Sequence, residues 1–95
     1  MARIRTHPGE ILAEEYLKPL GLSASKLAKV IGVPPNRISD LVRERRDLSA
    51  DTAIRLGRYF DVDARFWLNL QAAYDLSRAE ATFDYSHIAP RASAA

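Results

Sequence analysis

The sequence predicts a small all-α domain of five helices, and three observations lead to this fold class. Apolar residues recur at helical spacing through most of the chain, serine and proline stand where helices begin, and no convincing strand pattern occurs before the C-terminal tail. With 95 residues, the chain can hold one hydrophobic core. Its composition, 47% hydrophobic and 27% charged, is that of an ordinary folded globular protein.

The first predicted helix runs from about Pro8 to Lys18. Proline is favoured at the first helical position, because its missing N–H would have no partner there. The apolar residues of this segment form one stripe, and Pro19 and Gly21 are expected to end the helix.

Two shorter helices follow, joined by a turn that contains glycine. Ser23 is expected to cap the second helix, and Gly32 to end it, because glycine adopts a positive φ most readily. The third helix is expected to begin at Pro35, a residue suited to the first helical position. Its apolar face consists of Ile38, Leu41 and Val42.

Ser49 is expected to cap the fourth helix and Asp63 the fifth, which runs from about Ala64 to Ala81. Bulky apolar residues spread around most of the circumference of the fifth helix, so it requires a second partner surface. A second copy of the chain, related by a two-fold axis, is the expected partner. The predicted dimer interface consists of Phe66, Trp67, Leu70 and Tyr74.

Positive charge is concentrated between residues 26 and 58. This segment holds eight basic and four acidic residues, a balance of +4, whereas the rest of the chain holds six basic and eight acidic residues, a balance of −2. Clustered lysine and arginine attract phosphate backbones, so the asymmetry points to a polyanionic partner.

Two short helices joined by a glycine-containing turn, the second beginning with polar residues, have the pattern of a helix-turn-helix. In that motif the second helix lies in the major groove of DNA. Arg37 is placed to fork onto guanine, Asn36 to pair with adenine, and Asp40 to accept from cytosine or to orient a neighbouring arginine. The predicted DNA-binding residues are Ser25, Lys26, Pro35, Asn36, Arg37, Ser39, Asp40, Arg43 and Arg46.

Arg46 has two alternative roles in this prediction. It follows the third helix, where it is placed to contact backbone phosphate, as Ser25 and Lys26 are at the start of the second helix. The alternative is an exposed ion pair with Asp47 or Glu44.

The chain is therefore divided into a DNA-binding domain and a tail. The domain spans residues 1–81, with the helix-turn-helix at about 24–43 and the dimerising helix at about 64–81. In the tail, residues 82–95, Phe83 and Tyr85 alternate with polar residues, which permits a short strand on the sheet edge of a partner. A coil laid over the last helix is the alternative and the commoner arrangement. The end of the tail, residues 91–95, is expected to be disordered.

The motifs along the chain resemble those of a known family. Apolar or small residues fill the seven positions of the repressor-type helix-turn-helix signature, Leu27, Ala28, Ile31, Gly32, Val33, Ile38 and Leu41. The flanking motifs are His7-Pro8-Gly9-Glu10-Ile11-Leu12, Ser49-Ala50-Asp51-Thr52-Ala53 and Phe66-Trp67-Leu68-Asn69-Leu70-Gln71. With these flanks the chain is similar to the HigA-type antitoxins, over roughly residues 6–90.

The resemblance implies an all-helical, dimeric protein that binds a palindromic operator in double-stranded DNA. It also implies that the protein represses its own toxin–antitoxin operon and neutralises an RNA-cleaving toxin of the HigB type. An orphan regulator with the same fold and no toxin partner is the alternative.

Other classes of function find less support in the sequence. Neither histidine, His7 or His87, lies within helical reach of a second candidate ligand, and the chain has no cysteine. Glu10 and Glu14 are one helical turn apart, but one like-charged pair lacks the ligands that a hard cation needs. We therefore expect no enzyme activity, metal or cofactor. The remote alternatives are a metal-dependent nuclease and a module that binds only proteins, through Trp67 and Tyr74.

No membrane segment is expected either. The longest apolar runs are only a few residues long, whereas about 20 residues are needed to span a bilayer. No secretory signal is expected at the N-terminus, and a cytoplasmic location follows as the expectation.

Overall fold

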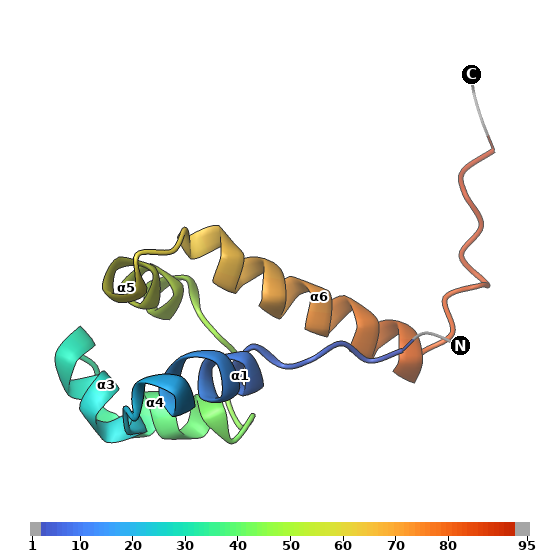
Figure 1. Cartoon of the computed structure of the whole chain (residues 1–95). Helices are drawn as coiled ribbons and strands as arrows, with labels where there is room; N and C mark the ends of the chain where they lie inside the picture. Colours follow the sequence, from blue (N-terminus) through green and yellow to red (C-terminus); the bar gives the residue numbers. More distant parts are fainter. Residues whose placement is uncertain (1–2, 93–95) are drawn as a thin grey trace.

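The computed structural model describes residues 3–92, which form helices and connecting segments (Figure 1). α1 (Pro8–Ile11), the π-helical segment η1 (Leu12–Leu17) and α2 (Lys18–Leu20) make one continuous first helix. The other helices are α3 (Ala24–Ile31), α4 (Pro35–Val42), α5 (Ala50–Phe60) and α6 (Ala64–Thr82). No strand occurs in the described residues, and the predicted all-α fold of five helices is confirmed.

The first helix continues to Leu20, so the prediction that Pro19 ends it was wrong. In a regular α-helix the ring of Pro19 would clash with the carbonyl of Glu15. The turn before it is wider, because the N–H of Lys18 donates to the carbonyl of Ala13, five residues back. The wider turn accommodates the proline, and the helix ends at Gly21, whose φ is 60°.

Polar side chains cap the starts of four helices. Ser23, Ser49 and Asp63 each accept a hydrogen bond from a backbone N–H two or three residues further on, as predicted. His7, whose role was not predicted, caps α1 through its Nδ1 atom. Gly32 ends α3 with a φ of 76°, also as predicted.

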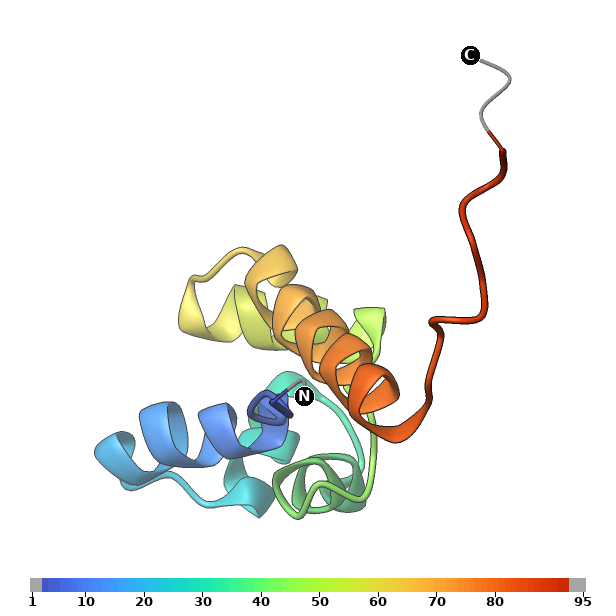
Figure 2. The same cartoon turned by 90° about the vertical axis from the view of Figure 1, so that its right-hand side faces the viewer.

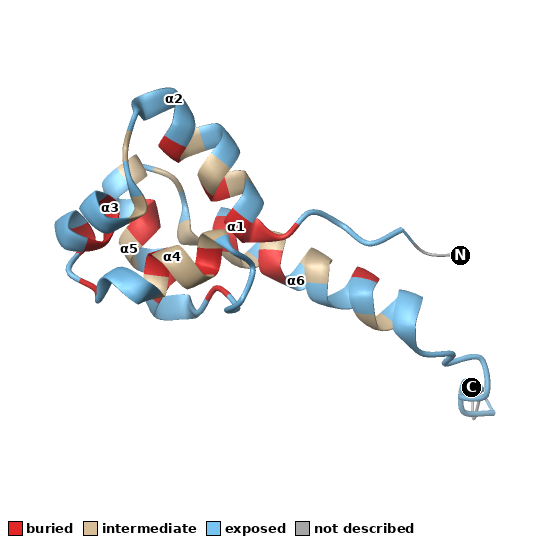
Figure 3. Cartoon of the chain, turned by 90° about the horizontal axis from the view of Figure 1, so that it is seen from below, coloured by how far each residue is buried: buried red, intermediate tan, exposed pale blue. Residues whose placement is uncertain are grey.

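The core is formed by the first helix, α3, α4, α5 and the first half of α6, and Figure 3 shows its buried residues on these elements. Trp67 is 0% exposed, and its ring lies 5.0 Å from that of Tyr16 and 6.5 Å from that of Phe60. Its placement in the dimer interface was therefore wrong, because a fully buried side chain cannot contact a second chain. Apolar residues spread around α6, so the sequence did not distinguish the face that packs on the chain's own core from a face that could contact a second chain.

The start of α1 lies directly against the end of α4. A Cβ atom on Gly9 would be 1.8 Å from the carbonyl oxygen of Leu41, so only glycine fits there. Beside this contact the ring of His7 is buried and meets the ring of Tyr74 edge-on, with centroids 4.7 Å apart. These contacts fix the start of the first helix between α4 and α6.

Gln71 joins α6 to the segment that follows α4. Its Oε1 atom accepts from the N–H of Leu48 at 2.7 Å, and its Nε2 atom donates to Asp75 at 2.9 Å and to Asp47 at 3.3 Å. The side chain is buried, so these bonds replace water that it has lost. The first half of α6 is thus attached to the exit of α4.

Beyond Gln71, α6 projects from the other helices and the tail leaves its end (Figure 1 and Figure 2). Residues 83–92 are all exposed, and they form neither the strand that was considered nor a coil over α6. They are coil that runs away from the helix (Figure 1). The predicted disorder of residues 91–95 lies in part outside the described residues.

Candidate nucleic-acid interface

The turn between α3 and α4 is fixed by backbone hydrogen bonds. The N–H of Val33 donates to the carbonyl of Ala28 at 2.9 Å, and that of Gly32 to Lys29 at 3.3 Å. This pattern closes a helix end around a left-handed residue. After the turn, Ile38 and Leu41 of α4 enter the core, which leaves the opposite face of α4 outside.

The nine predicted DNA-binding residues all lie at or near the surface around α3, α4 and the loop after α4, which Figure 3 views from below. Those that are exposed are Ser25, Lys26, Pro35, Asn36, Arg43 and Arg46. Those that are half-buried are Arg37, Ser39 and Asp40. The fold therefore gathers long polar side chains on one side of a short helix.

The start of α4 differs from the starts of the other helices. Pro34 stands at its N-cap position and makes no side-chain hydrogen bond, whereas His7, Ser23, Ser49 and Asp63 cap their helices. An uncapped N-terminus presents unsatisfied N–H groups and the positive end of the helix dipole. Such a helix start favours an anion such as a phosphate.

Arg37 is less free than the prediction assumed. Its Nη1 atom donates to Oδ2 of Asp51 in α5 at 2.6 Å, and Nε of Arg55 donates to the same oxygen at 2.9 Å. Hydrogen bonds from Arg55 and then Arg37 hold the pKa of Asp51 below its ordinary value, so this carboxylate stays ionised.

Arg46 also has a partner, although not either of those predicted. Its Nη2 atom lies 3.9 Å from Oδ2 of Asp40, so the ion pair proposed with Asp47 or Glu44 was wrong. Of the two roles considered for Asp40, orienting a neighbouring arginine is the one that this geometry matches. The pair is long and partly exposed, which leaves Arg46 able to exchange it for a phosphate.

A sharp turn follows α4. Glu44 has a φ of 61°, and the N–H of Arg45 donates to the carbonyl of Asp40 at 2.8 Å. Glutamate rarely adopts this left-handed conformation, and no pattern in the sequence predicts it. The turn leaves Arg43, Arg45 and Arg46 exposed at the end of α4.

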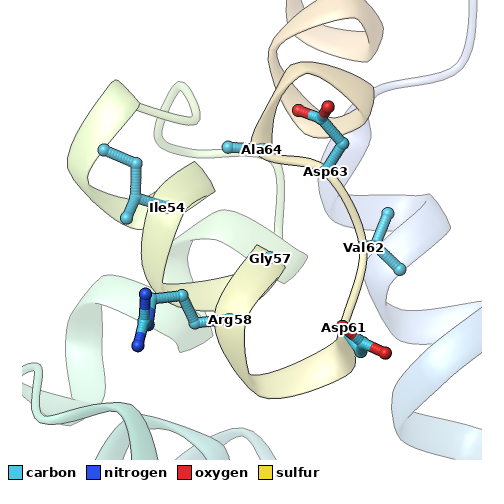
Figure 4. A pocket seen from close by; sticks show the side chains of 7 residues that line it. All are labelled: Ile54, Gly57, Arg58, Asp61, Val62, Asp63 and Ala64. Atoms are coloured by element: carbon cyan, nitrogen blue, oxygen red, sulfur yellow. The ribbon is translucent and has the colours of Figure 1, made fainter.

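The rest of the described surface shows no catalytic arrangement. An open hollow of about 530 Å³ lies where α5 meets α6, and its charged side chains, among them Arg58, Asp61 and Asp63, do not converge (Figure 4). Within residues 3–92, no three metal-ligating side chains gather. Over the same residues, no helix combines the length and the apolar character needed to cross a membrane.

The comparisons with known proteins identify the family. The model of the Helix-turn-helix family matches residues 14–67, so the chain belongs to the helix-turn-helix family. Within that family it is similar to the HigA antitoxins and the addiction-module antidotes, which are not enzymes. The resemblance stated from the sequence is confirmed, as is the expectation that the chain is not an enzyme.

Three relatives show how close this similarity is. Virulence-associated protein I of Dichelobacter nodosus is 65% identical over 74 residues, covering 78% of this chain and 68% of that protein. The structure of the Pseudomonas aeruginosa antitoxin HigA with the higBA promoter has a TM-score of 0.89 at 45% identity, covering 95% of this chain and 100% of that one. An addiction module antidote of the HigA family from Coxiella burnetii has a TM-score of 0.77 at 45% identity, covering 81% and 84%. The matched segments span about two thirds of the length of the curated relatives.

Proposed function

We propose that the chain is a repressor and antitoxin that binds double-stranded operator DNA through α4. The observation that carries the proposal is the exposed, polar and uncapped start of α4, together with the exposed arginines that follow the end of the same helix. A HigA antitoxin with the same fold was solved with its promoter DNA, which supports this assignment. Asn36 and Arg43 are the base-reading candidates with exposed side chains, and Ser25, Lys26 and Arg46 are the phosphate-binding candidates.

A binding titration tests the role of α4. The ligand is a duplex that carries the promoter upstream of the chain's own reading frame, compared with a scrambled duplex of equal length. We expect Asn36→Ala with Arg43→Ala to weaken promoter binding by about 1–3 kcal/mol per lost base contact and to reduce discrimination between the duplexes. The control is Arg58→Ala, which removes an exposed arginine of α5 that lines the hollow where α5 meets α6. Equal losses in the two variants would show that α4 does not read DNA.

The salt dependence of binding separates phosphate contacts from base contacts. If Arg46 binds a phosphate, Arg46→Ala weakens both duplexes alike and lowers the slope of log K against log salt by roughly one per lost contact. If Arg46 serves only its pair with Asp40, neither the slope nor the affinity changes appreciably.

We propose further that the chain acts as a homodimer. A palindrome is read by two recognition helices about 34 Å apart, so two copies are required. Of the predicted interface residues, Phe66 is 38% exposed, whereas Leu70 and Tyr74 are half-buried against their own chain. The larger exposed apolar surface lies further along, at Leu76 of α6 and Phe83 of the tail. We assign the dimer interface to this side of α6 and to the tail.

The toxin partner is the most specific part of the proposal. The similarity to HigA antitoxins supports a toxin of the HigB type, which the chain would bind and neutralise. Co-purification with the product of the adjacent reading frame tests this. A small basic protein that co-purifies supports the antitoxin, and its absence favours an orphan regulator. If the toxin binds away from α4, the Asn36→Ala and Arg43→Ala variant loses promoter binding and still protects cells.

A further inference from the structure

A network of charged side chains joins the three helices of the DNA-binding unit. Oδ2 of Asp51, in the first turn of α5, accepts from Nη1 of Arg37 at 2.6 Å and from Nε of Arg55 at 2.9 Å. Nη1 of Arg55 donates in turn to the carbonyl of Ile31 at 2.7 Å, at the end of α3. Asp51 therefore connects α4 to α5, and Arg55 connects α5 to α3.

The network restrains Arg37 of α4 and does not include Arg43, which directly follows α4. The side chain of Arg37 is 30% exposed and bound to Asp51, whereas Arg43 is exposed and makes no ion pair within the described residues. The bond to Asp51 uses Nη1 of Arg37, and no hydrogen bond from Nη2 or Nε to a described residue is present. Arg37 thus retains donors for a ligand while its position is fixed.

We propose that Asp51 is a positioning residue for DNA recognition, which acts by holding the guanidinium of Arg37 at the start of α4. This inference rests on the proposed function, in which the start of α4 meets the operator. An arginine that is already held loses less rotamer freedom on binding, and it presents its donors in one geometry. Asp51 itself need not touch DNA.

Removal of Asp51 should change the affinity for the operator in opposite directions, depending on whether Asp51 positions Arg37 or acts only through its negative charge. A carboxylate near DNA repels phosphate, so its removal alone strengthens binding to any duplex. If Asp51 positions Arg37, its removal weakens binding to the operator although the protein has become more positive. A purely electrostatic role for Asp51 predicts the opposite change.

The experiment is a double-mutant cycle on the full chain. Wild type, Asp51→Asn, Arg37→Ala and the double variant are titrated with the promoter duplex and with the scrambled duplex. We expect Asp51→Asn to weaken promoter binding about tenfold and to leave scrambled binding unchanged or stronger. In the Arg37→Ala background, Asp51→Asn should change both duplexes alike, because no arginine is left to position.

Two further variants control for charge and for folding. Glu44→Gln removes the same charge from an exposed residue after α4 that makes no ion pair within the described residues, and should strengthen both duplexes slightly. Asp51→Glu keeps the charge and displaces the carboxylate, so it should also weaken promoter binding selectively. If Asp51→Asn does not fold, as judged by thermal unfolding, Asp51→Glu takes its place in the cycle.

The outcomes separate this inference from the proposed function. If wild type does not distinguish the promoter from the scrambled duplex, the proposed function fails and this inference fails with it. If wild type does distinguish them, but Asp51→Asn strengthens both or its effect is the same with and without Arg37, only the positioning role is overturned.

Discussion

The molecule has two regions that differ in how they use apolar residues. In the body, residues 7–71, large apolar side chains such as Leu12, Leu27 and Trp67 are fully buried. In the arm, residues 72–92, Leu76, Phe83 and Ile88 are 63–65% exposed. Since α6 runs through both, its first half packs in the core, whereas its second half exposes the apolar surface to which we assign the dimer interface. The apolar character of a helix therefore does not reveal which surface the helix will cover.

The largest expected effect tests the body. Trp67→Ala should lower the free energy of unfolding by about 3–5 kcal/mol, because it removes a fully buried indole and leaves a cavity. Chemical denaturation monitored by circular dichroism measures this change. A variant that has the stability of wild type but sediments as a monomer would show that Trp67 belongs to the dimer interface.

A smaller effect is expected in the arm. Leu76→Asp should weaken dimerisation by about 3 kcal/mol, roughly a 100-fold rise in the Kd, since the lost apolar contact occurs once in each copy. The fold of each chain should persist, because this side chain makes little contact with the body. Sedimentation equilibrium measures the Kd, and Ile54→Asp, at an exposed apolar residue of the body, is the matched control. An equal Kd for dimerisation in the two variants would show that the arm is not part of the dimer interface.

The joint between the two regions is tested at Gln71. Gln71→Ala should cost about 1–3 kcal/mol of stability, because it leaves the buried N–H of Leu48 without its acceptor. Amide hydrogen exchange at Leu48 should increase more than exchange in α3, which lies away from the joint. Unchanged exchange at Leu48 would mean that α6 does not fix the exit of α4.

The smallest effect concerns acid stability in the body. Bonds from Arg55 and Arg37 lower the pKa of Asp51, so its contribution to stability is present above the pKa of an unfolded aspartate, about 3.9, and is lost as the pH falls through the lowered pKa. The difference in Tm between wild type and Asp51→Asn should therefore shrink between about pH 5 and pH 3. A difference that stays constant over this range would show that the charge of Asp51 does not stabilise the body.

Much of the body could be predicted from the sequence, because its signals are local. Ser23, Ser49 and Asp63 cap helices, and Gly32 ends one, since each of these roles depends on the few residues that follow or precede it. The helix-turn-helix was predicted on the same basis, from the apolar face of a short helix after a glycine turn.

What could not be predicted depends on residues that are distant in the sequence. Gln71 binds a backbone N–H 23 residues away, and Arg37 binds Asp51 14 residues away, so neither contact follows from helical spacing. The pair of Asp51 and Arg55 was open to prediction, because the two are one turn apart on α5. The burial of Trp67 depends on rings supplied by Tyr16 and Phe60, and only the folded chain brings these together.

We propose that the body reads DNA while the arm joins two copies on one operator. Sedimentation velocity of a fluorescent promoter duplex, titrated with the chain, measures how many copies are bound to each duplex. On this proposal, we expect two copies of wild type bound together per palindromic site, and single copies of Leu76→Asp bound independently and more weakly. Wild type that occupies a complete palindrome as one copy, or Leu76→Asp that binds as an intact pair, would contradict it.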